Sequence, residues 1–375
     1  MDTDFLQIPL IDHHCHAIVG PNRQADTEAL LRVTSEAPHG YPVEDLLERA
    51  IWPAVLTYVS RYSGHVVASY EELGPVLQDV DYATYCKALF HDARFEQLFI
   101  DTGFAPAGAP SLGEIGRLTG AKTRPILRLE SVAEAVFKES SSFSQWWESV
   151  QFKVGQARAN GYVGAKSIAA YRSGLALHGV SYADAERAFA VWKSSDSARL
   201  EDERLLCFLV WECAPILAKQ SLPLQFHTGY GDPDTDLRLG NPLHLRDFVE
   251  TFTPQGLAVV LLHTYPYHRE AGYMASVYDG VYFDTSLIVP LGLTSARRVV
   301  SEALELAPYS RFLFASDAHT RPELFAIAAD LFKDALEHHL QDPMLSRFSG
   351  AGTRERWAQL VCHDNARKLY LETSP

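Results

Sequence analysis

The sequence predicts a (β/α)8 barrel, and three observations carry this prediction. Short apolar runs recur along the 375 residues, each followed by polar or Gly/Pro punctuation and then by a helical pattern. Eight such runs occur, the number that a closed barrel of this kind requires. No glycine-rich phosphate-binding loop follows the first run, which argues against a doubly wound open sheet, the alternative α/β fold.

The order of the elements follows from these runs. The expected strands are 7–12, 96–101, 124–129, 162–166, 222–227, 257–263, 280–284 and 311–316. Amphipathic helical stretches are expected at 131–160, 182–220, 241–251, 294–306 and 353–371. Strands that alternate with helices pair in parallel, so the helices are expected to surround the strands.

The spacing of the first two strands is unusual, because about 80 residues separate them where about 30 serve a single βα unit. We therefore expect residues 21–95 to form a helical insertion within a single domain of residues 1–375. Loops after strands line the catalytic face of a barrel. The insertion is expected near the active-site mouth, as a lid or a homodimer contact; a purely structural elaboration is the alternative.

Composition limits the class of protein. With 33 basic and 47 acidic residues the net charge is −14, which argues against nucleic acid as a partner. The five cysteines are scattered and form no CxxC pair, as in reduced intracellular proteins. The N-terminus lacks the features of a signal peptide, and no apolar run approaches the roughly 18 residues of a membrane span. We expect a cytoplasmic protein that acts on a small molecule and does not associate with membranes.

Side chains that bind metals stand at the ends of five expected strands. They are His14, His16, Lys166, His227, His263 and Asp317. His14 and His16 are two positions apart, so an extended chain presents both imidazoles on one side. The carboxyl ends of all strands meet at one mouth of a barrel, so these residues are expected to converge. Imidazole and carboxylate suit zinc and its neighbours, and the sequence therefore predicts a metal site.

This arrangement resembles the amidohydrolase superfamily of metal-dependent barrels, whose pattern is His-x-His, Lys or another ligand, His, His and Asp at strands one, four, five, six and eight. GAKSIAAYRSGL at 164–175, HTGYGD at 227–232, DLRLGNPLHL at 236–245 and ASVY at 275–278 are similar to its amidohydrolase-2 group. They are most similar to the amidohydrolase domains fused to glutamine-synthetase-like domains in plant nodulin-related and fungal FluG proteins. The resemblance implies a TIM-like barrel of the metal-dependent hydrolase type.

The resemblance implies hydrolysis of an amide C–N bond through a metal-bound hydroxide. A metal lowers the pKa of bound water towards about 7 and polarises the carbonyl under attack. Asp317 is expected to bind the metal and accept the proton of the water, with His263 as the second catalytic residue. Zinc is the first expectation for the metal, and manganese and iron are the alternatives.

Two metal stoichiometries fit the ligands. With one metal, His14, His16, His227 and Asp317 bind it, and His263 is free for acid–base chemistry. With two metals, Lys166 is carboxylated and bridges: one ion is held by His14, His16, Lys166 and Asp317, the other by Lys166, His227 and His263. A protonated Lys166 in an ion pair, or bound to a substrate carboxylate, is the alternative to the carbamate.

The residues expected to bind substrate are Tyr171, Arg172, Arg238 and His319. Arginine matches a carboxylate bidentately, so a substrate with a carboxylate is expected, such as a γ-glutamyl compound or an N-acyl amino acid. A structural salt bridge is the alternative role for each arginine. Asp12 lies one step deeper on the side of the ligands and is expected to orient them.

Two other functions compete with amide hydrolysis. The amidohydrolase-2 resemblance fits a non-oxidative decarboxylase equally well at the metal ligands, and such enzymes use one metal. A non-catalytic barrel that serves signalling or assembly is the third hypothesis, and the complete ligand set argues against it.

Overall fold

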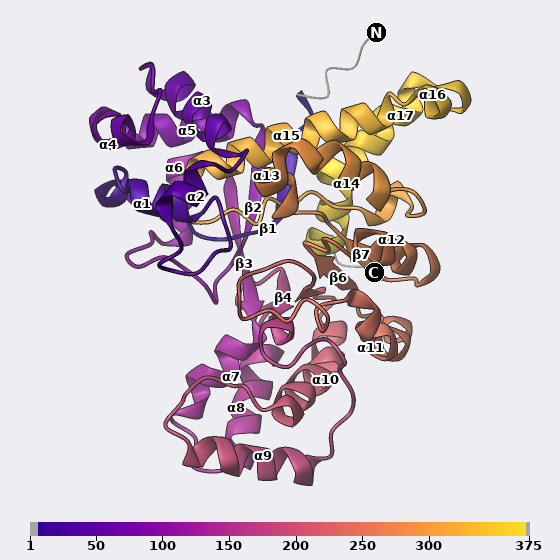
Figure 1. The fold of residues 1–375 in the computed structure, drawn as a ribbon. Coiled ribbons are helices and arrows are strands. Elements are labelled where there is room, and N and C mark those ends of the chain that lie inside the picture. Colours follow the sequence, from indigo (N-terminus) through magenta and orange to yellow (C-terminus); the bar gives the residue numbers. More distant parts are fainter. Residues whose placement is uncertain (1–6, 373–375) are drawn as a thin grey trace.

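Seven parallel strands form one curled sheet in a computed structural model that describes residues 7–372 (Figure 1). The strands follow each other in chain order from β1 to β7, and each pairs in parallel with the next. They are β1 (Leu10–Cys15), β2 (Phe95–Asp101), β3 (Lys122–Arg128), β4 (Gly164–Ser167), β5 (Leu224–His227), β6 (Val259–Leu262) and β7 (Val281–Phe283). The N-terminal residues Met1–Asp4, which carried the signal-peptide argument, lie outside the described residues.

The expected eighth strand, 311–316, closes the barrel without forming a regular ladder. The amide of Leu313 donates to the carbonyl of Phe283 (3.0 Å) on the β7 side. On the β1 side, the amide of His13 donates to the carbonyl of Phe314 (3.3 Å). The ladder is interrupted because the amide of Ser316 donates to the Asp12 carboxylate (3.0 Å) instead of to a backbone carbonyl. A regular strand was therefore the wrong prediction here, although the segment lies where the barrel needs it.

Helices connect the strands and surround them (Figure 1). They are α1 (Thr27–Arg32), α2 (Val43–Leu47), α3 (Trp52–Ser63), α4 (Tyr70–Asp79), α5 (Tyr82–Asp92), α6 (Leu112–Thr119), α7 (Leu129–Phe137), α8 (Phe143–Gly155), α9 (Tyr182–Ser194), α10 (Glu203–Lys219), α11 (Arg246–Phe252), α12 (His268–Val277), α13 (Ile288–Gly292), α14 (Ala296–Ala303), α15 (Pro322–Leu340), α16 (Pro343–Phe348) and α17 (Ala351–Gln359). None of the helices in residues 7–372 is long and apolar enough to cross a membrane.

Two of the long amphipathic stretches each form two helices. The stretch 131–160 divides into α7 and α8 because Ser142 caps the amide of Gln145 and starts a new helix. The stretch 182–220 divides into α9 and α10 because the Asp202 carboxylate accepts from the first amides of α10. A side-chain cap satisfies amides that the helix itself leaves unpaired, so a second helix starts at each cap.

Between β1 and β2 the chain forms the five helices α1–α5, which gather on one side of the barrel (Figure 1). Apolar side chains of α5 pack against α15, and the ring centroids of Phe90 in α5 and Phe325 in α15 lie 5.1 Å apart. Arg321, fully buried, donates to the carbonyl of Gln24 (2.7 Å) and fixes the start of this segment. The expected role of residues 21–95, as a lid or a homodimer contact, stays a prediction.

Candidate active site

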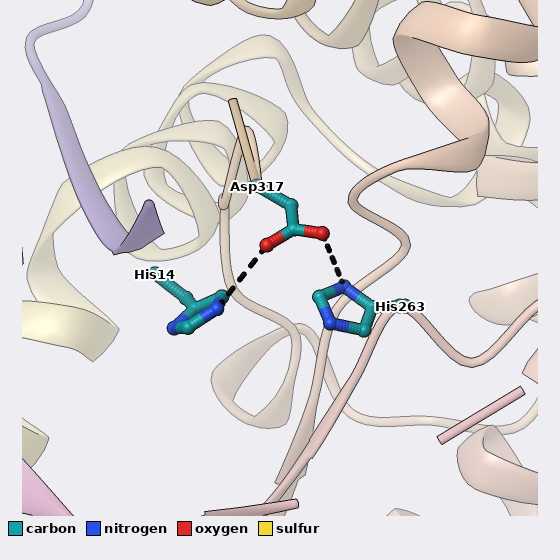
Figure 2. Close-up of side chains that lie close together, drawn as sticks. All are labelled: His14, His263 and Asp317. Carbon is teal, nitrogen blue, oxygen red and sulfur yellow. Dashed lines mark ion pairs between the residues drawn. The ribbon is translucent and has the colours of Figure 1, made fainter. Parts of the chain in front are cut away.

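The Asp317 carboxylate contacts three imidazoles at the carboxyl end of the barrel. Figure 2 shows two of them, His14 and His263. Its Oδ1 lies 3.2 Å from Nε2 of His14 and 3.4 Å from Nε2 of His16, and its Oδ2 lies 3.5 Å from Nδ1 of His263. β1 supplies His14, and His16 follows directly after it. Residues about 300 positions apart thus converge, as strands of a closed barrel require.

Lys166, on β4, faces the same cluster. Its Nζ lies 2.8 Å from Nε2 of His14 and 3.6 Å from Oδ2 of Asp101, and its side chain is buried. Asp101 ends β2 and also binds Arg128, whose Nε donates to Oδ2 at 3.0 Å. Asp101 was missed from the sequence, although it ends an expected strand as the other ligands do.

Two sets of metal-binding atoms, each with members within 4.8 Å of one another, occur among the described residues. One comprises His14, His263 and Asp317, and the other His14, His16 and Asp101. His227 belongs to neither set. Its ring centroid lies 4.5 Å from that of His263, and its buried Nε2 has no hydrogen-bond partner among the described residues.

A buried polar network fixes the ring of His14. Gln225, on β5, donates from Nε2 to the carbonyl of His13 (2.8 Å), so its Oε1 is left to face Nδ1 of His14 (3.0 Å). Because an amide oxygen only accepts, Nδ1 of His14 carries the proton and Nε2 presents a lone pair. That lone pair faces Asp317 Oδ1, another acceptor. Nζ of Lys166 lies 2.8 Å from this same Nε2, so the lone pair has a donor in the lysine while it faces the carboxylate.

The same logic fixes His263. Burial acts to raise the pKa of the Asp284 carboxyl, but His13, His263 and Ser286 together outweigh burial and lower that pKa to about 2. Ser286 therefore donates from Oγ to Asp284 Oδ1 (2.6 Å) and accepts from Nδ1 of His263 (2.8 Å). Nε2 of His263 is buried, has no hydrogen-bond partner in residues 7–372 and presents its lone pair. Neither Gln225 nor Ser286 was foreseen from the sequence, because neither residue type marks a site.

Asp12 contacts the two ligand-bearing segments through their backbone and Ser316. Its carboxylate accepts from the backbone amide of His14 (3.4 Å) and from the amide and hydroxyl of Ser316 (3.0 and 2.5 Å), and it makes no hydrogen bond to an imidazole among residues 7–372. Burial raises the pKa of Asp12 to about 8. Asp12 therefore holds β1, which carries His14, to the closing segment, which carries Asp317, whereas Gln225 and Ser286 contact the imidazole rings of His14 and His263.

Burial sets the protonation of the cluster. It lowers the pKa of His14 to about 3 and that of His263 to about 4, and it holds that of His227 far below its usual value. Burial acts to raise the pKa of Asp317, but the imidazoles of His263 and His14 outweigh it and hold the pKa well below the usual range. Burial also lowers the pKa of Lys166. Neutral imidazoles beside an ionised carboxylate are the forms that bind a divalent metal.

Two ligand-bearing strand ends have unusual backbone conformations. His263 has φ 68° and Asp317 has φ 52°, in the left-handed region that residues with a side chain rarely adopt. The amide of His263 is held by Asp284 (2.8 Å), and the amide of Asp317 donates to the carbonyl of His14 (3.1 Å). Such backbone strain persists where surrounding contacts over-determine it, typically at functional sites.

A cavity of about 210 Å³ opens above this cluster. Its lining includes His16, Lys166, Tyr171, Arg172, His227, His263, Asp317 and His319, together with Glu36, Phe104, Arg128, Ile168, Arg199, Asp232 and Asp234. The Tyr171 ring lies 4.1 Å from that of His227, and His319 packs edge-on against His16 (6.3 Å).

Of the two arginines expected to bind substrate, the cavity includes Arg172 and not Arg238. Arg172 is nearly buried, and its Nε and Nη1 have no partner among the described residues. Arg238 is 87% exposed and pairs with Asp236 (2.6 Å), so the structure does not bring it to the site. Glu36, from the segment between α1 and α2, lines the cavity and was missed from the sequence.

A family model described as Amidohydrolase matches residues 174–371, which include His227, His263 and Asp317. The chain belongs to the amidohydrolase family. It is an enzyme of this superfamily with the fold of a metal-dependent hydrolase, and family membership implies a divalent metal. The neutral imidazoles, the ionised Asp317 and the unpartnered Nε2 atoms of His227 and His263 fit such an ion.

Individual proteins support this assignment. The chain is 34% identical over 290 residues to protein fluG of Emericella nidulans; the match covers 69% of the chain, which spans about a third (33%) of fluG. A candidate metal-dependent hydrolase from Lactobacillus casei is 42% identical, with TM-score 0.90 over 98% of this chain and 97% of that one. A uronate isomerase from Thermotoga maritima shares the fold at 14% identity and TM-score 0.70, covering 98% and 95% of the two chains.

Proposed function

We propose that this enzyme hydrolyses the amide bond of a substrate that carries a carboxylate, of the γ-glutamyl or N-acyl amino-acid type. One observation carries the proposal: the ionised Asp317, in contact with three imidazoles, lies in the same cavity as the unpartnered guanidinium nitrogens of Arg172. The first group is suited to activating a water and the second to holding an anion.

The residues divide the chemistry among them. His14, His16, His263 and Asp317 would hold a divalent metal, with Asp101, Lys166 or His227 as further ligands. When bound, such a metal lowers the pKa of a water ligand towards about 7 and polarises the substrate carbonyl. Asp317 accepts the proton of the attacking water at a carboxylate oxygen and returns it to the departing amine nitrogen. Arg172 holds the substrate carboxylate and so orients the scissile bond.

Zinc is the metal we propose, because its imidazole and carboxylate ligands match this set, and manganese or iron are the alternatives to test. For Lys166 we propose the carboxylated, bridging form. The lowered pKa of Lys166, caused by burial, supports it, because only a neutral amine adds carbon dioxide. A crystal structure with anomalous data at the metal edges would give metal identity, metal count and the state of Lys166.

A non-oxidative decarboxylase is the second candidate, favoured by one contact. Nζ of Lys166 lies 3.6 Å from the Asp101 carboxylate, an ion pair that would keep the lysine protonated and leave a one-metal site. The two candidates release different products. We expect the zinc-loaded enzyme to release amine from γ-glutamyl or N-acyl amino-acid amides. Release of carbon dioxide from unsaturated or aromatic acids, without amine release from the amides, would contradict the hydrolase proposal.

A further inference from the structure

Two carboxylates at the mouth of the cavity form no ion pair with any of the described residues, although the charge of Arg49 acts on one and that of Arg199 on the other. Glu36 comes from the segment between α1 and α2, and Asp232 from the loop that follows β5. Both line the active-site cavity and the shallower depression beside it. Among the described residues no hydrogen bond or ion pair reaches the Glu36 carboxylate, and Asp232 accepts only from the amide of Asp234 (2.9 Å).

Two of the basic residues that line the cavity are paired with other carboxylates. Arg199 pairs with Asp234 (2.7 Å), and Arg128 pairs with Asp101. Burial, with the charges of Asp317 and Asp232, raises the pKa of Glu36 to about 7, although the nearby guanidinium of Arg49 acts in the opposite direction. A carboxylate that is this reluctant to ionise gains most from a cation that arrives with the ligand.

A guanidinium in the same cavity is only partly paired. The Arg172 side chain is 10% exposed, and its nearest carboxylate oxygen, on Glu134, lies 3.5 Å from Nη2. Its Nε and Nη1 are buried and have no partner among the described residues. Buried guanidinium donors are costly when unpaired, so this arginine calls for an anionic ligand.

We propose that the cavity recognises the zwitterionic head of an amino acid, with Arg172 binding its carboxylate and Glu36, assisted by Asp232, binding its free ammonium. The inference rests on the proposed function and narrows it. A γ-glutamyl amide retains a free α-ammonium, whereas the nitrogen of an N-acyl amino acid is acylated and uncharged. The substrate is then a γ-glutamyl-type amide, and Glu36 determines specificity.

The proposed recognition of a free ammonium can be tested by measuring equilibrium binding, without any catalytic turnover. Glutamate and glutarate have the same chain and two carboxylates, and they differ by the ammonium. Titration calorimetry on the zinc-loaded protein is expected to show glutamate binding at least about tenfold more tightly than glutarate, the size of one charge-assisted hydrogen bond. Glu36→Gln should abolish this preference by weakening glutamate alone. Glu44→Gln, an exposed site on the neighbouring α2, is the matched control and should retain the preference.

Glutarate affinity doubles as the folding control, because it should be equal in the wild type and in Glu36→Gln. If that variant loses glutarate as well, Asp232→Asn decides, and it must reduce the glutamate preference. Equal affinities for the two ligands in the wild type, absent binding of glutamate, or an unchanged preference in Glu36→Gln would each overturn the inference. A glutamate preference without hydrolysis of γ-glutamyl amides would remove the proposed reaction and leave the recognition site standing.

Discussion

The floor of the cavity, formed by the cluster around Asp317, and its mouth, which carries Glu36 and Arg172, differ in how far their polar groups are paired within the protein. In the floor, the rings of His14 and His263 are each fixed by a buried partner, Gln225 and Ser286, so that a lone pair faces inward. In the mouth, Glu36 and two of the three guanidinium nitrogens of Arg172 have no hydrogen-bond partner in the part of the chain that the structure describes. The floor has its geometry set before any ligand arrives, whereas the mouth keeps its interactions for a ligand.

This difference separates two kinds of mutational effect. A fully connected buried network fixes ligand geometry, so its loss weakens metal binding and chemistry together. Unpaired charges at the mouth cost stability until a ligand satisfies them, so their loss is expected to change substrate affinity and specificity. The predictions below test this separation, from the largest expected effect to the smallest.

The largest effect is expected for Asp317→Asn in the floor. An amide cannot accept the proton of the attacking water, so kcat should fall by about a thousandfold or more. The measurement is steady-state amide hydrolysis, with the metal content of each preparation determined in parallel. Near-normal kcat at full metal content would show that the proton acceptor is another residue.

Arg172→Met in the mouth should raise KM by about 10- to 100-fold and change kcat much less, since a hydrogen bond to a charged group contributes about 1.5–3 kcal/mol. Arg238→Met in the same assay compares the sequence-based expectation with the structural placement. Because Arg238 is 87% exposed and outside the cavity lining, its KM should stay within about twofold of wild type. The reverse ranking would place the anion site outside the cavity.

Gln225→Leu removes the acceptor that holds Nδ1 of His14 and should weaken metal binding by about 10- to 100-fold. Competition with a chelator of known affinity measures this. Gln255→Leu, on the exposed surface, is the matched control for loss of a glutamine amide. Unchanged affinity in Gln225→Leu would mean that the network does not set the imidazole geometry.

The smallest effect is a change in the pH dependence of stability at Glu36. Its pKa is raised from 4.5 to about 7 in the folded protein, so the folded state binds more protons than the unfolded one between these values. Wild-type stability should therefore fall relative to Glu36→Gln as pH rises from about 4.5 to 7. Urea unfolding of both proteins at pH 5 and pH 8 measures the difference. If the two proteins show the same change in stability with pH, the pKa of Glu36 is not raised by folding.

Spacing and strand ends made part of the site predictable. His14 and His16 are two positions apart, and His263 and Asp317 follow apolar runs, so a barrel had to bring them together. Asp101 also ends a strand, but a single carboxylate there is too common to mark a ligand. The interrupted eighth strand was not predictable, since it depends on the contact of Ser316 with Asp12.

The sequence by itself determined the order of strands and helices, the barrel and the ligand-bearing strand ends, because these depend on local periodicity. Only the tertiary structure decided that Gln225 and Ser286 fix the imidazoles, that Arg172 and not Arg238 faces the cavity, and that Glu36 reaches it. These contacts join residues far apart in the chain, and their direction depends on loops and insertions that have no period. Local sequence patterns specify helices and strands, whereas tertiary packing decides which side chains come into contact.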